Sequence, residues 1–262
     1  MKRIRGGSGL GDSVYLRPVV DYFIRAGEPA TVMSNFPDVF IGSGAKVEQF
    51  NRININVLAH YSLDRQNQNS TQFADMLRCA KLPPDVPLRF EWSVRNKALV
   101  DGVRAAAAGR PVIIVHGGRT PFGRTDGLGA EILPERAAFD VAVRALRECF
   151  TVRVGKGPSL YDIPARSDLT DRTSVSDLLD LIMNCDGVVT QCGYPVPMAE
   201  CLGKPLLAVW SARGLQSPNP TIASITPAKI LSAKTSRFVM DDWPEEQIVD
   251  VARSAILQDT YA

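Results

Sequence analysis

The first forty residues carry apolar side chains in an order that predicts a strand, a loop, a helix and a second strand. Lys2–Arg5 is expected to form a short strand, and apolar residues recur at near-helical spacing over Asp12–Ala26. Gly27 would end that helix, and Ala30–Met33 has the character of a buried strand. A strand, a helix and a strand in this order predict a parallel sheet with a right-handed crossover.

The same order of elements restarts after residue 110. Pro111–Val115 and Leu206–Trp210 are continuous apolar runs, which are typical of strands buried on both faces. Further strands are expected at Thr151–Val154 and Gly187–Thr190. Amphipathic segments predict helices at Pro134–Cys149, Ser174–Asn184, Pro197–Leu202 and Trp243–Leu257. In the second of these helices, Asp177 and Asp180 are expected on the solvated face.

The segment between these two halves has a weaker pattern. Strand-like pieces occur at Lys46–Phe50 and Ile55–Ala59, the prolines of residues 83–87 exclude a regular element, and a helix is expected over Ser93–Gly109. The whole pattern predicts an α/β protein with two βα-type halves that meet near residues 109–111. We therefore expect an N-terminal domain at 1–109 and a C-terminal domain at 110–262. For the last helix, packing back on the N-terminal domain is an open alternative.

Composition narrows the classes of function. The 262 residues include 30 Lys and Arg against 28 Asp and Glu, a net charge of +2 that argues against a general nucleic-acid coat. The longest apolar runs fall far short of the roughly 18–20 residues that cross a bilayer. The N-terminus shows no apolar signal segment, so we expect a cytoplasmic protein. Five scattered cysteines without a CxxC pair, and only two histidines, favour buried free thiols over redox or zinc sites.

The first candidate for chemistry is the glycine-rich segment 6–12, between the first expected strand and helix. Gly9 and Gly11 would let backbone amides approach an anion at the helix N-terminus, as in a phosphate cradle. The spacing of these glycines does not match the dinucleotide-binding fingerprint. Asp12 follows them, and from the sequence it is either a catalytic carboxylate or a capping residue of the helix.

The second candidate is the turn that follows the expected strand at Gly187–Thr190. It contains Gln191, Cys192 and Gly193, and a short helix starts at about Pro197. Ligands of open α/β sheets bind beyond the carboxyl ends of the strands, where this turn would lie. Its amides are therefore candidates for binding a diphosphate, the alternative being a tight connection without a ligand.

Taken together, these segments resemble glycosyltransferase family 9, the ADP-heptose heptosyltransferases. Gly9-Leu10-Gly11-Asp12 followed by Arg17-Pro18 is similar to the motif that opens this family. The segment 168–178, DLTDRTSVSDL, resembles its DLTGxTSLxEL, and 184–189, NCDGVV, its ADLVVSND strand. Residues 192–205 resemble its TGPMHLAAALGKP turn with one insertion. The likeness is best over residues 165–210.

The resemblance implies a GT-B fold, in which two Rossmann-like α/β/α domains with parallel sheets face a central cleft. It also implies an inverting, metal-independent transfer without a cofactor, from a nucleotide-sugar such as ADP-heptose or another NDP-sugar to a hydroxyl acceptor. The acceptor would be a glycan, a glycolipid or a modified macromolecule, and the oligomeric state is left open. The family's proposed general base corresponds to Asp12.

Several positions depart from the family pattern. Gln191-Cys192-Gly193 replaces Asp-Thr-Gly, Pro197 stands at the family's histidine, and Glu131 aligns with a family lysine. The missing positive charge would come from Arg119, Arg124 or Lys156, with Arg119 favoured because it follows the His116-Gly117-Gly118 loop.

Other positions have more than one interpretation. His116 and Gly117 would lie at a phosphate or sugar, although a histidine at this place is equally typical of a structural hydrogen bond, and Glu200 would accept ribose or sugar hydroxyls. The altered positions leave two rival functions open. These are a nucleotide-sugar epimerase or hydrolase on the same fold, and a non-catalytic module that binds sugar nucleotides or glycans.

Overall fold

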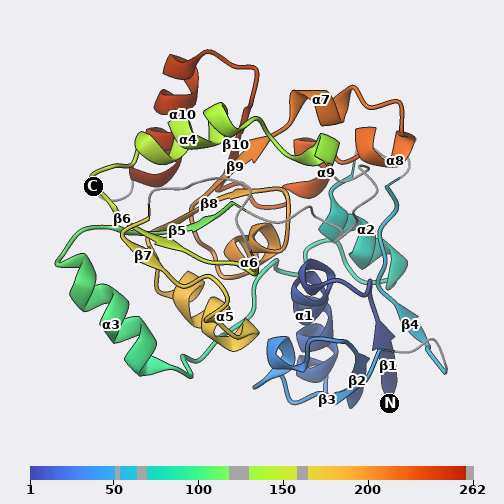
Figure 1. Ribbon diagram of the computed structural model, residues 1–262. Coiled ribbons are helices and arrows are strands. Elements are labelled where there is room, and N and C mark those ends of the chain that lie inside the picture. Colours follow the sequence, from blue (N-terminus) through green and yellow to red (C-terminus); the bar gives the residue numbers. More distant parts are fainter. Residues whose placement is uncertain (51–53, 64–69, 118–129, 158–164, 258–262) are drawn as a thin grey trace.

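The structure is a computed structural model that describes residues 1–50, 54–63, 70–117, 130–157 and 165–257. These residues form two separate parallel sheets, each combined with helices (Figure 1). The N-terminal sheet has four strands in the order β3-β2-β1-β4, and the second has six in the order β10-β9-β8-β5-β6-β7. In the described part of the chain, no helix is long and apolar enough to cross a membrane.

The first sheet is built around β1, which pairs with β2 on one side and with β4 on the other, always in parallel. Ile4 stands beside Val32 and Val57 in register and is fully buried, so one apolar residue of β1 anchors the sheet to the core. Helix α1 connects β1 to β2. The elements of this sheet are β1 (Lys2–Arg5), α1 (Leu10–Arg25), β2 (Ala30–Met33), β3 (Lys46–Glu48) and β4 (Val57–Leu58).

The second sheet is buried on both faces. In β5, Val112 and Ile114 join one apolar cluster while Ile113 and Val115 join another, because successive side chains of a strand point to opposite faces. This explains why its strands are continuous apolar runs in the sequence. The strands are β5 (Val112–His116), β6 (Phe150–Arg153), β7 (Ser167–Asp168), β8 (Gly187–Gln191), β9 (Leu206–Trp210) and β10 (Ser236–Met240).

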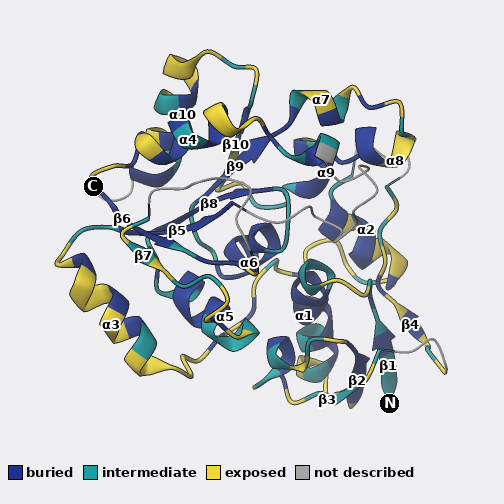
Figure 2. Ribbon diagram, viewed as in Figure 1, coloured by how far each residue is buried: buried dark blue, intermediate teal, exposed yellow. Residues whose placement is uncertain are grey.

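Helices cover the two faces of the second sheet. On one face lie α4 (Arg136–Arg144) and α10 (Glu245–Leu257), which contact each other and β9. The last helix thus packs on the second sheet and not back on the first. On the other face lie α5 (Val175–Met183) and α6 (Pro195–Cys201), and α6 is buried along its whole length (Figure 2).

A carboxylate that we expected in solvent is buried. Asp180 on α5 is 0% exposed, and it accepts hydrogen bonds from the Trp92 indole at 2.7 Å and from the backbone amides of Arg95 and Asn96. The expectation of a solvated face is therefore wrong at this position. These bonds hold the segment before α3 (Lys97–Ala107), so α3 packs against α5 and β5. The domain boundary at 109–110 stays a prediction.

The sequence pattern missed several short elements. Helix α2 (Gln72–Cys79) lies in the segment where the pattern is weak, and β10 completes one edge of the second sheet. Two helical turns carry too few apolar positions to establish a period. The remaining missed elements are β7 and the short helices η1 (Pro37–Phe40), η3 (Ala130–Ile132), α7 (Ala212–Leu215), α8 (Pro220–Ala223) and α9 (Pro227–Ile230).

The two sheets are joined by buried contacts between helices. Figure 1 shows α1 between the first sheet and α6, and the two helices are packed together. The buried Tyr15 hydroxyl donates to Glu200 at 2.5 Å, and the buried Lys229 ammonium pairs with Asp75 of α2. One cluster of buried apolar residues includes members of both sheets. The halves therefore share a common core.

Candidate functional site

A cavity of about 550 Å³ lies where the N-terminus of α1 meets the turn between β8 and α6. It is placed beyond the carboxyl ends of β5 and β8, the position at which ligands of parallel sheets bind. Its walls come from both halves of the chain. The lining residues are Ser8, Gly9, Leu10, Gly11, Asp12, Tyr61, Leu63, Gln72, His116, Lys156, Gln191, Cys192, Gly193, Tyr194, Pro197, Ile225 and Ile230.

Asp12 stands in the first turn of α1 with its carboxylate at the cavity. One oxygen, Oδ2, accepts a hydrogen bond from the backbone amide of Gly9 at 3.1 Å. This bond belongs to the capping of α1, so the structural interpretation of Asp12 is confirmed. Its other oxygen, Oδ1, lies 3.5 Å from Nε2 of Gln72. The capping role therefore leaves the carboxylate beside the cavity, and the catalytic interpretation is compatible with it.

The glycines before Asp12 are required by close packing. A Cβ on Gly7 would lie 2.2 Å from Oδ2 of Asp12, and one on Gly9 would lie 3.1 Å from the same atom. A Cβ on Gly11 would lie 3.2 Å from Cγ of Pro197, where α1 meets α6. The segment thus makes room for the carboxylate and lets the two halves approach at the cavity.

Two residues that the sequence analysis did not identify contact Asp12. Gln72 comes from α2, and Tyr61 comes from the segment after β4. Burial raises the pKa of the Tyr61 phenol far above its usual value, and the charge of Asp12 and its hydrogen bond with the phenol add to this effect. Tyr61 is therefore a neutral donor at the Asp12 carboxylate. The weak pattern of residues 36–82 gave no signal for either residue.

His116 ends β5 and is 6% exposed. Its Nδ1 lies 3.4 Å from the Thr190 hydroxyl, and its ring meets Tyr194 edge to face at 4.7 Å between centroids. Burial lowers the pKa of His116 to about 4, so the imidazole is neutral at physiological pH. A neutral imidazole can donate or accept a hydrogen bond but supplies no charge to an anion.

The turn after β8 and one exposed cation also line the cavity. Gln191 is almost fully buried at the end of β8, and burial raises the pKa of the Cys192 thiol to about 12, so the thiol is protonated. Gly193 follows in the turn just before α6. Lys156, after β6, is exposed and also lines the cavity. Among the described lining residues, Lys156 is the side chain that carries a positive charge.

The structure brings most of the predicted site residues to one place. The residues at the cavity are Gly9, Gly11, Asp12, His116, Gln191, Cys192 and Gly193. Gly117 lines a small neighbouring pocket of about 10 Å³, which also contains Lys156. Arg119 and Arg124 lie outside the described residues.

Glu200 is placed away from the cavity. It is 2% exposed, and its carboxylate accepts hydrogen bonds from the Tyr15 hydroxyl, the amides of Ser232 and Ala233, and the Ser236 hydroxyl. These bonds occupy both oxygens. Glu200 therefore has a role in joining the two halves, and its predicted contact with a ligand stays a prediction.

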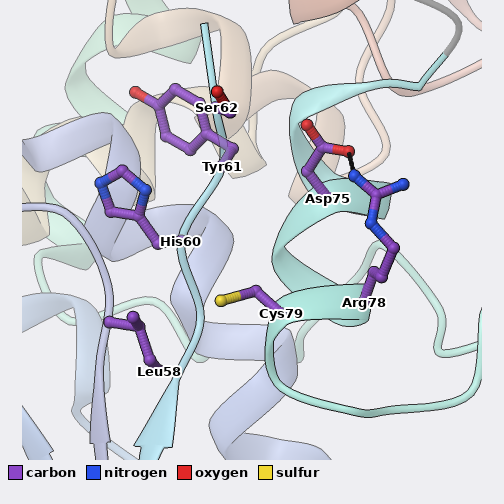
Figure 3. Close-up of a pocket in the computed structure, with 7 residues that line it drawn as sticks. All are labelled: Leu58, His60, Tyr61, Ser62, Asp75, Arg78 and Cys79. Carbon is purple, nitrogen blue, oxygen red and sulfur yellow. Dashed lines mark hydrogen bonds and ion pairs between the residues drawn. The ribbon is translucent and has the colours of Figure 1, made fainter. Parts of the chain in front are cut away.

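A second cavity of about 290 Å³ lies between the segment after β4 and α2 (Figure 3). Tyr61 lines both cavities, so the two are neighbours. The Asp75 carboxylate in its wall is paired with the buried Lys229 and with Arg78, at 2.5 Å from the latter. Asp75 therefore has a structural role, since it links α2 to α9.

Comparison with known proteins gives similarity at the level of structure. No model of a known protein family matches the sequence, and no curated protein matches it. The structure is similar to ADP-heptose LPS heptosyltransferase II from E. coli, with a TM-score of 0.65 and 13% identity over 99% of this chain and 100% of that chain. It is also similar to a family 9 glycosyl transferase from Veillonella parvula, with a TM-score of 0.64 and 12% identity over 98% of this chain and 97% of that chain. A third similar structure is a proposed UDP-N-acetylglucosamine 2-epimerase from Listeria monocytogenes, with a TM-score of 0.51 and 11% identity over 99% of this chain and 88% of that chain.

The chain has the GT-B fold. The predicted fold class is thus confirmed, because two parallel sheets with helices meet at a shared cavity and the similar structures include GT-B glycosyltransferases over nearly the whole chain. Identities of this size establish the fold and not the reaction, since one fold supports many activities. In the GT-B fold of this chain, the carboxylate of Asp12 comes from one half and the turn at Cys192 from the other.

Proposed function

We propose that this protein is a glycosyltransferase that moves a sugar from a nucleotide-diphosphate donor to a hydroxyl acceptor, with Asp12 as the general base. One observation carries the proposal. The Asp12 carboxylate of the first half and the Cys192–Gly193 turn of the second half line the same cavity. A base and an anion-binding wall across one space are what transfer from a diphosphate leaving group requires.

In the proposed reaction, Asp12 accepts the proton of the acceptor hydroxyl while the hydroxyl oxygen forms a bond to the anomeric carbon. The bond from that carbon to the diphosphate breaks, and its electron pair leaves with the nucleotide. The acceptor attacks from the face opposite to the leaving group, so the anomeric configuration is inverted. No step in this scheme needs a metal ion, because protein groups stabilise the leaving charge.

The donor would lie against the second half. Cys192 and Gly193 line the cavity, so their backbone amides are candidates to bind a diphosphate, and Lys156 offers a cation for it. Lys156 was one of the three basic residues that the sequence suggested for this role. Neutral His116 would donate or accept a hydrogen bond at the donor's phosphate or sugar.

The experiment has two stages. Thermal-shift measurements with ADP-, UDP-, GDP- and dTDP-sugars identify the donor, because a ligand that binds only the folded state raises the melting temperature. Transfer is then followed by mass spectrometry, and the anomeric configuration of the product by NMR. If no donor shifts the melting temperature, the proposed function is wrong.

Asp12→Asn separates catalysis from folding. The amide keeps an oxygen that can accept the Gly9 amide bond, so α1 should remain capped. We expect donor affinity within about threefold of wild type and a loss of transfer of at least 10²-fold, as is typical of a removed general base. The control is Asp101→Asn, which alters an exposed carboxylate paired with Lys97 on α3. Transfer at the wild-type rate in Asp12→Asn would contradict the role of Asp12.

One rival function is supported by the structural similarity to the proposed epimerase from Listeria monocytogenes. The transfer assay, run with and without an acceptor, distinguishes a transferase from an epimerase or hydrolase. A transferase releases little free sugar without an acceptor, whereas an epimerase or hydrolase converts the donor alone. A protein that binds the donor and converts it under neither condition would be a non-catalytic binding module.

A further inference from the structure

The cavity at Asp12 has a polar end and an apolar end. In the second sheet, β6 and β9 flank the central pair of β5 and β8 on opposite sides. Lys156 follows β6, whereas Ile225 and Ile230 belong to the segment between β9 and β10. The order of the strands therefore places the cation at one end of the cavity and the two isoleucines at the other.

The apolar end lies on the side of Asp12. Lys229, next to Ile230, pairs with Asp75 on α2, and the same helix carries Gln72, whose amide lies 3.5 Å from Asp12. The backbone of Ile230 also accepts a hydrogen bond from Tyr15 of α1 at 3.2 Å. Ile230 is thus tied to both helices that flank the carboxylate.

The side chains at this end are held in place. Ile225 and Ile230 are 5% and 8% exposed, and the carbonyl of Ile225 accepts a hydrogen bond from the Trp210 indole at 3.0 Å. Leu63 packs on the same core cluster and lines the cavity, as does the ring of Tyr61. The wall beside the base is therefore preformed and apolar.

Such a wall does not suit a sugar as acceptor. A sugar carries a hydroxyl on nearly every carbon, and each hydroxyl that enters an apolar site without a partner loses its hydrogen bond to water. Among the described polar side chains that line the cavity beside the base, Asp12 already contacts Gln72 and the Tyr61 hydroxyl, and Ser8 adds one further hydroxyl. They can serve one hydroxyl at the base but not a ring of them.

An aromatic acceptor with one hydroxyl group suits both the apolar wall and the single polar position at the base. Its ring would replace water against Tyr61, Leu63 and the isoleucines, and its single hydroxyl would face Asp12. A phenol has a pKa of about 10, well below that of water at about 15.7, so a carboxylate takes its proton more readily. Deprotonation and burial thus favour the same class of compound.

We propose that the acceptor is a phenolic hydroxyl on an aromatic ring that binds between Tyr61, Leu63 and Ile230. This inference rests on the proposed function. The phenol oxygen forms the bond to the anomeric carbon, its proton passes to Asp12, and the nucleoside diphosphate leaves with the electron pair of the broken bond. Asp12 then returns the proton to water.

The test compares acceptor classes with the donor that the thermal-shift screen selects. The phenols are 4-methylumbelliferone, 2-naphthol and a hexapeptide with one tyrosine, and the other compounds are methyl glycosides and 1-octanol. We expect kcat/KM for at least one phenol to exceed every value of the other set by tenfold or more. The peptide distinguishes a macromolecular source of the phenol from a small-molecule one.

A substitution at Leu63 tests where the ring of the phenolic acceptor binds. We expect Leu63→Asn to raise KM for the phenol about tenfold, with kcat and donor affinity within about twofold of wild type. The control, Val94→Asn, alters an apolar residue that is 39% exposed and lines neither cavity, and it should leave both constants unchanged. An unchanged KM in Leu63→Asn would overturn the proposed position of the ring.

The outcomes separate the two proposals. Donor binding with transfer only to glycosides or to octanol would overturn the phenolic acceptor and leave the glycosyltransferase function intact. A donor that never binds would overturn both.

Discussion

Replacing Gly7 by alanine should displace the Asp12 carboxylate while the protein stays folded. The added Cβ would lie 2.2 Å from Oδ2 and 2.5 Å from Cγ of Asp12, whereas non-bonded carbon atoms prefer about 3.5–4.0 Å. The side chain of Asp12 is the part that can move, so its carboxylate must shift by about 1 Å or more. That shift breaks the hydrogen bond from the Gly9 amide, which measures 3.1 Å.

The two consequences differ in size. Loss of a helix cap costs about 1 kcal/mol, which lowers the melting temperature by roughly 2–4 °C in a protein of this length. A misplacement of about 1 Å at a catalytic group costs roughly 10²-fold in rate. We therefore expect Gly7→Ala to lose about two orders of magnitude in kcat for transfer, with little loss of stability or of donor affinity.

A graded series checks the reasoning. A Cβ on Gly9 would lie 3.1 Å from Oδ2, so Gly9→Ala should have the same effects at smaller size. Gly102→Ala is the control, because a Cβ there meets nothing within 4 Å and alanine favours the helix by up to about 1 kcal/mol. Stability is measured by thermal unfolding and kcat by mass spectrometry. A kcat for Gly7→Ala within twofold of wild type would refute the catalytic position of the carboxylate.

Two further predictions concern the contacts that hold the fold together. Asp180→Ala should destabilise the protein by about 3 kcal/mol or more in urea unfolding, because it leaves the buried Trp92 indole and two partly buried backbone amides without an acceptor; a change below about 1 kcal/mol would contradict this account. Lys229→Met should destabilise the protein by about 3 kcal/mol, because it removes the buried cation paired with the Asp75 carboxylate and leaves the largely exposed Arg78 as its charged partner. Adding Asp75→Leu should recover most of the loss.

The stability that the Lys229–Asp75 pair contributes depends on pH. Burial opposes ionisation of Asp75, but hydrogen bonds from Lys229 and Ser70 outweigh it, so the pKa of Asp75 lies below its ordinary value of 3.8. A lowered pKa in the folded state means that the pair stabilises the protein fully above about pH 4 and loses this contribution as the pH falls further. The difference between wild type and Lys229→Met should therefore shrink in acid.

The sequence predicted the sheets well because burial on both faces leaves a strong local signal. β2 and β9 have the predicted bounds, and the predicted α1 differs from the observed one by two residues at its start and one at its end. The cavity could be anticipated for a related reason. Asp12 follows β1 of the first sheet and Cys192 follows β8 of the second, so each lies at the carboxyl edge of its own sheet, where ligands of parallel sheets bind.

The features that the sequence did not predict depend on contacts between distant parts of the chain. Asp180 occupies a helix position that is typical of solvent exposure, and its burial depends on Trp92, which lies 88 residues away. Glu200 looked available for a ligand, yet its partner Tyr15 is 185 residues away. Gln72 reaches Asp12 from a helix too short to be predicted. The local pattern of apolar residues cannot predict contacts between residues so far apart in the sequence.

The joint between the halves has a consequence for the cavity. In many two-domain enzymes a hinge closes the domains around a ligand, and the site is complete only when they are closed. Here the buried pair of Lys229 and Asp75, the bond from Tyr15 to Glu200, and the packing of Gly11 on Pro197 would all have to break for the halves to separate. Separation would also expose apolar side chains of the core cluster that the two halves share, each worth about 1.5–3 kcal/mol when fully buried, so an open state would be populated at well below one part in a hundred. The halves therefore stay together around the cavity without a ligand, and under the proposed function the fixed wall at Ile230 would select among acceptors.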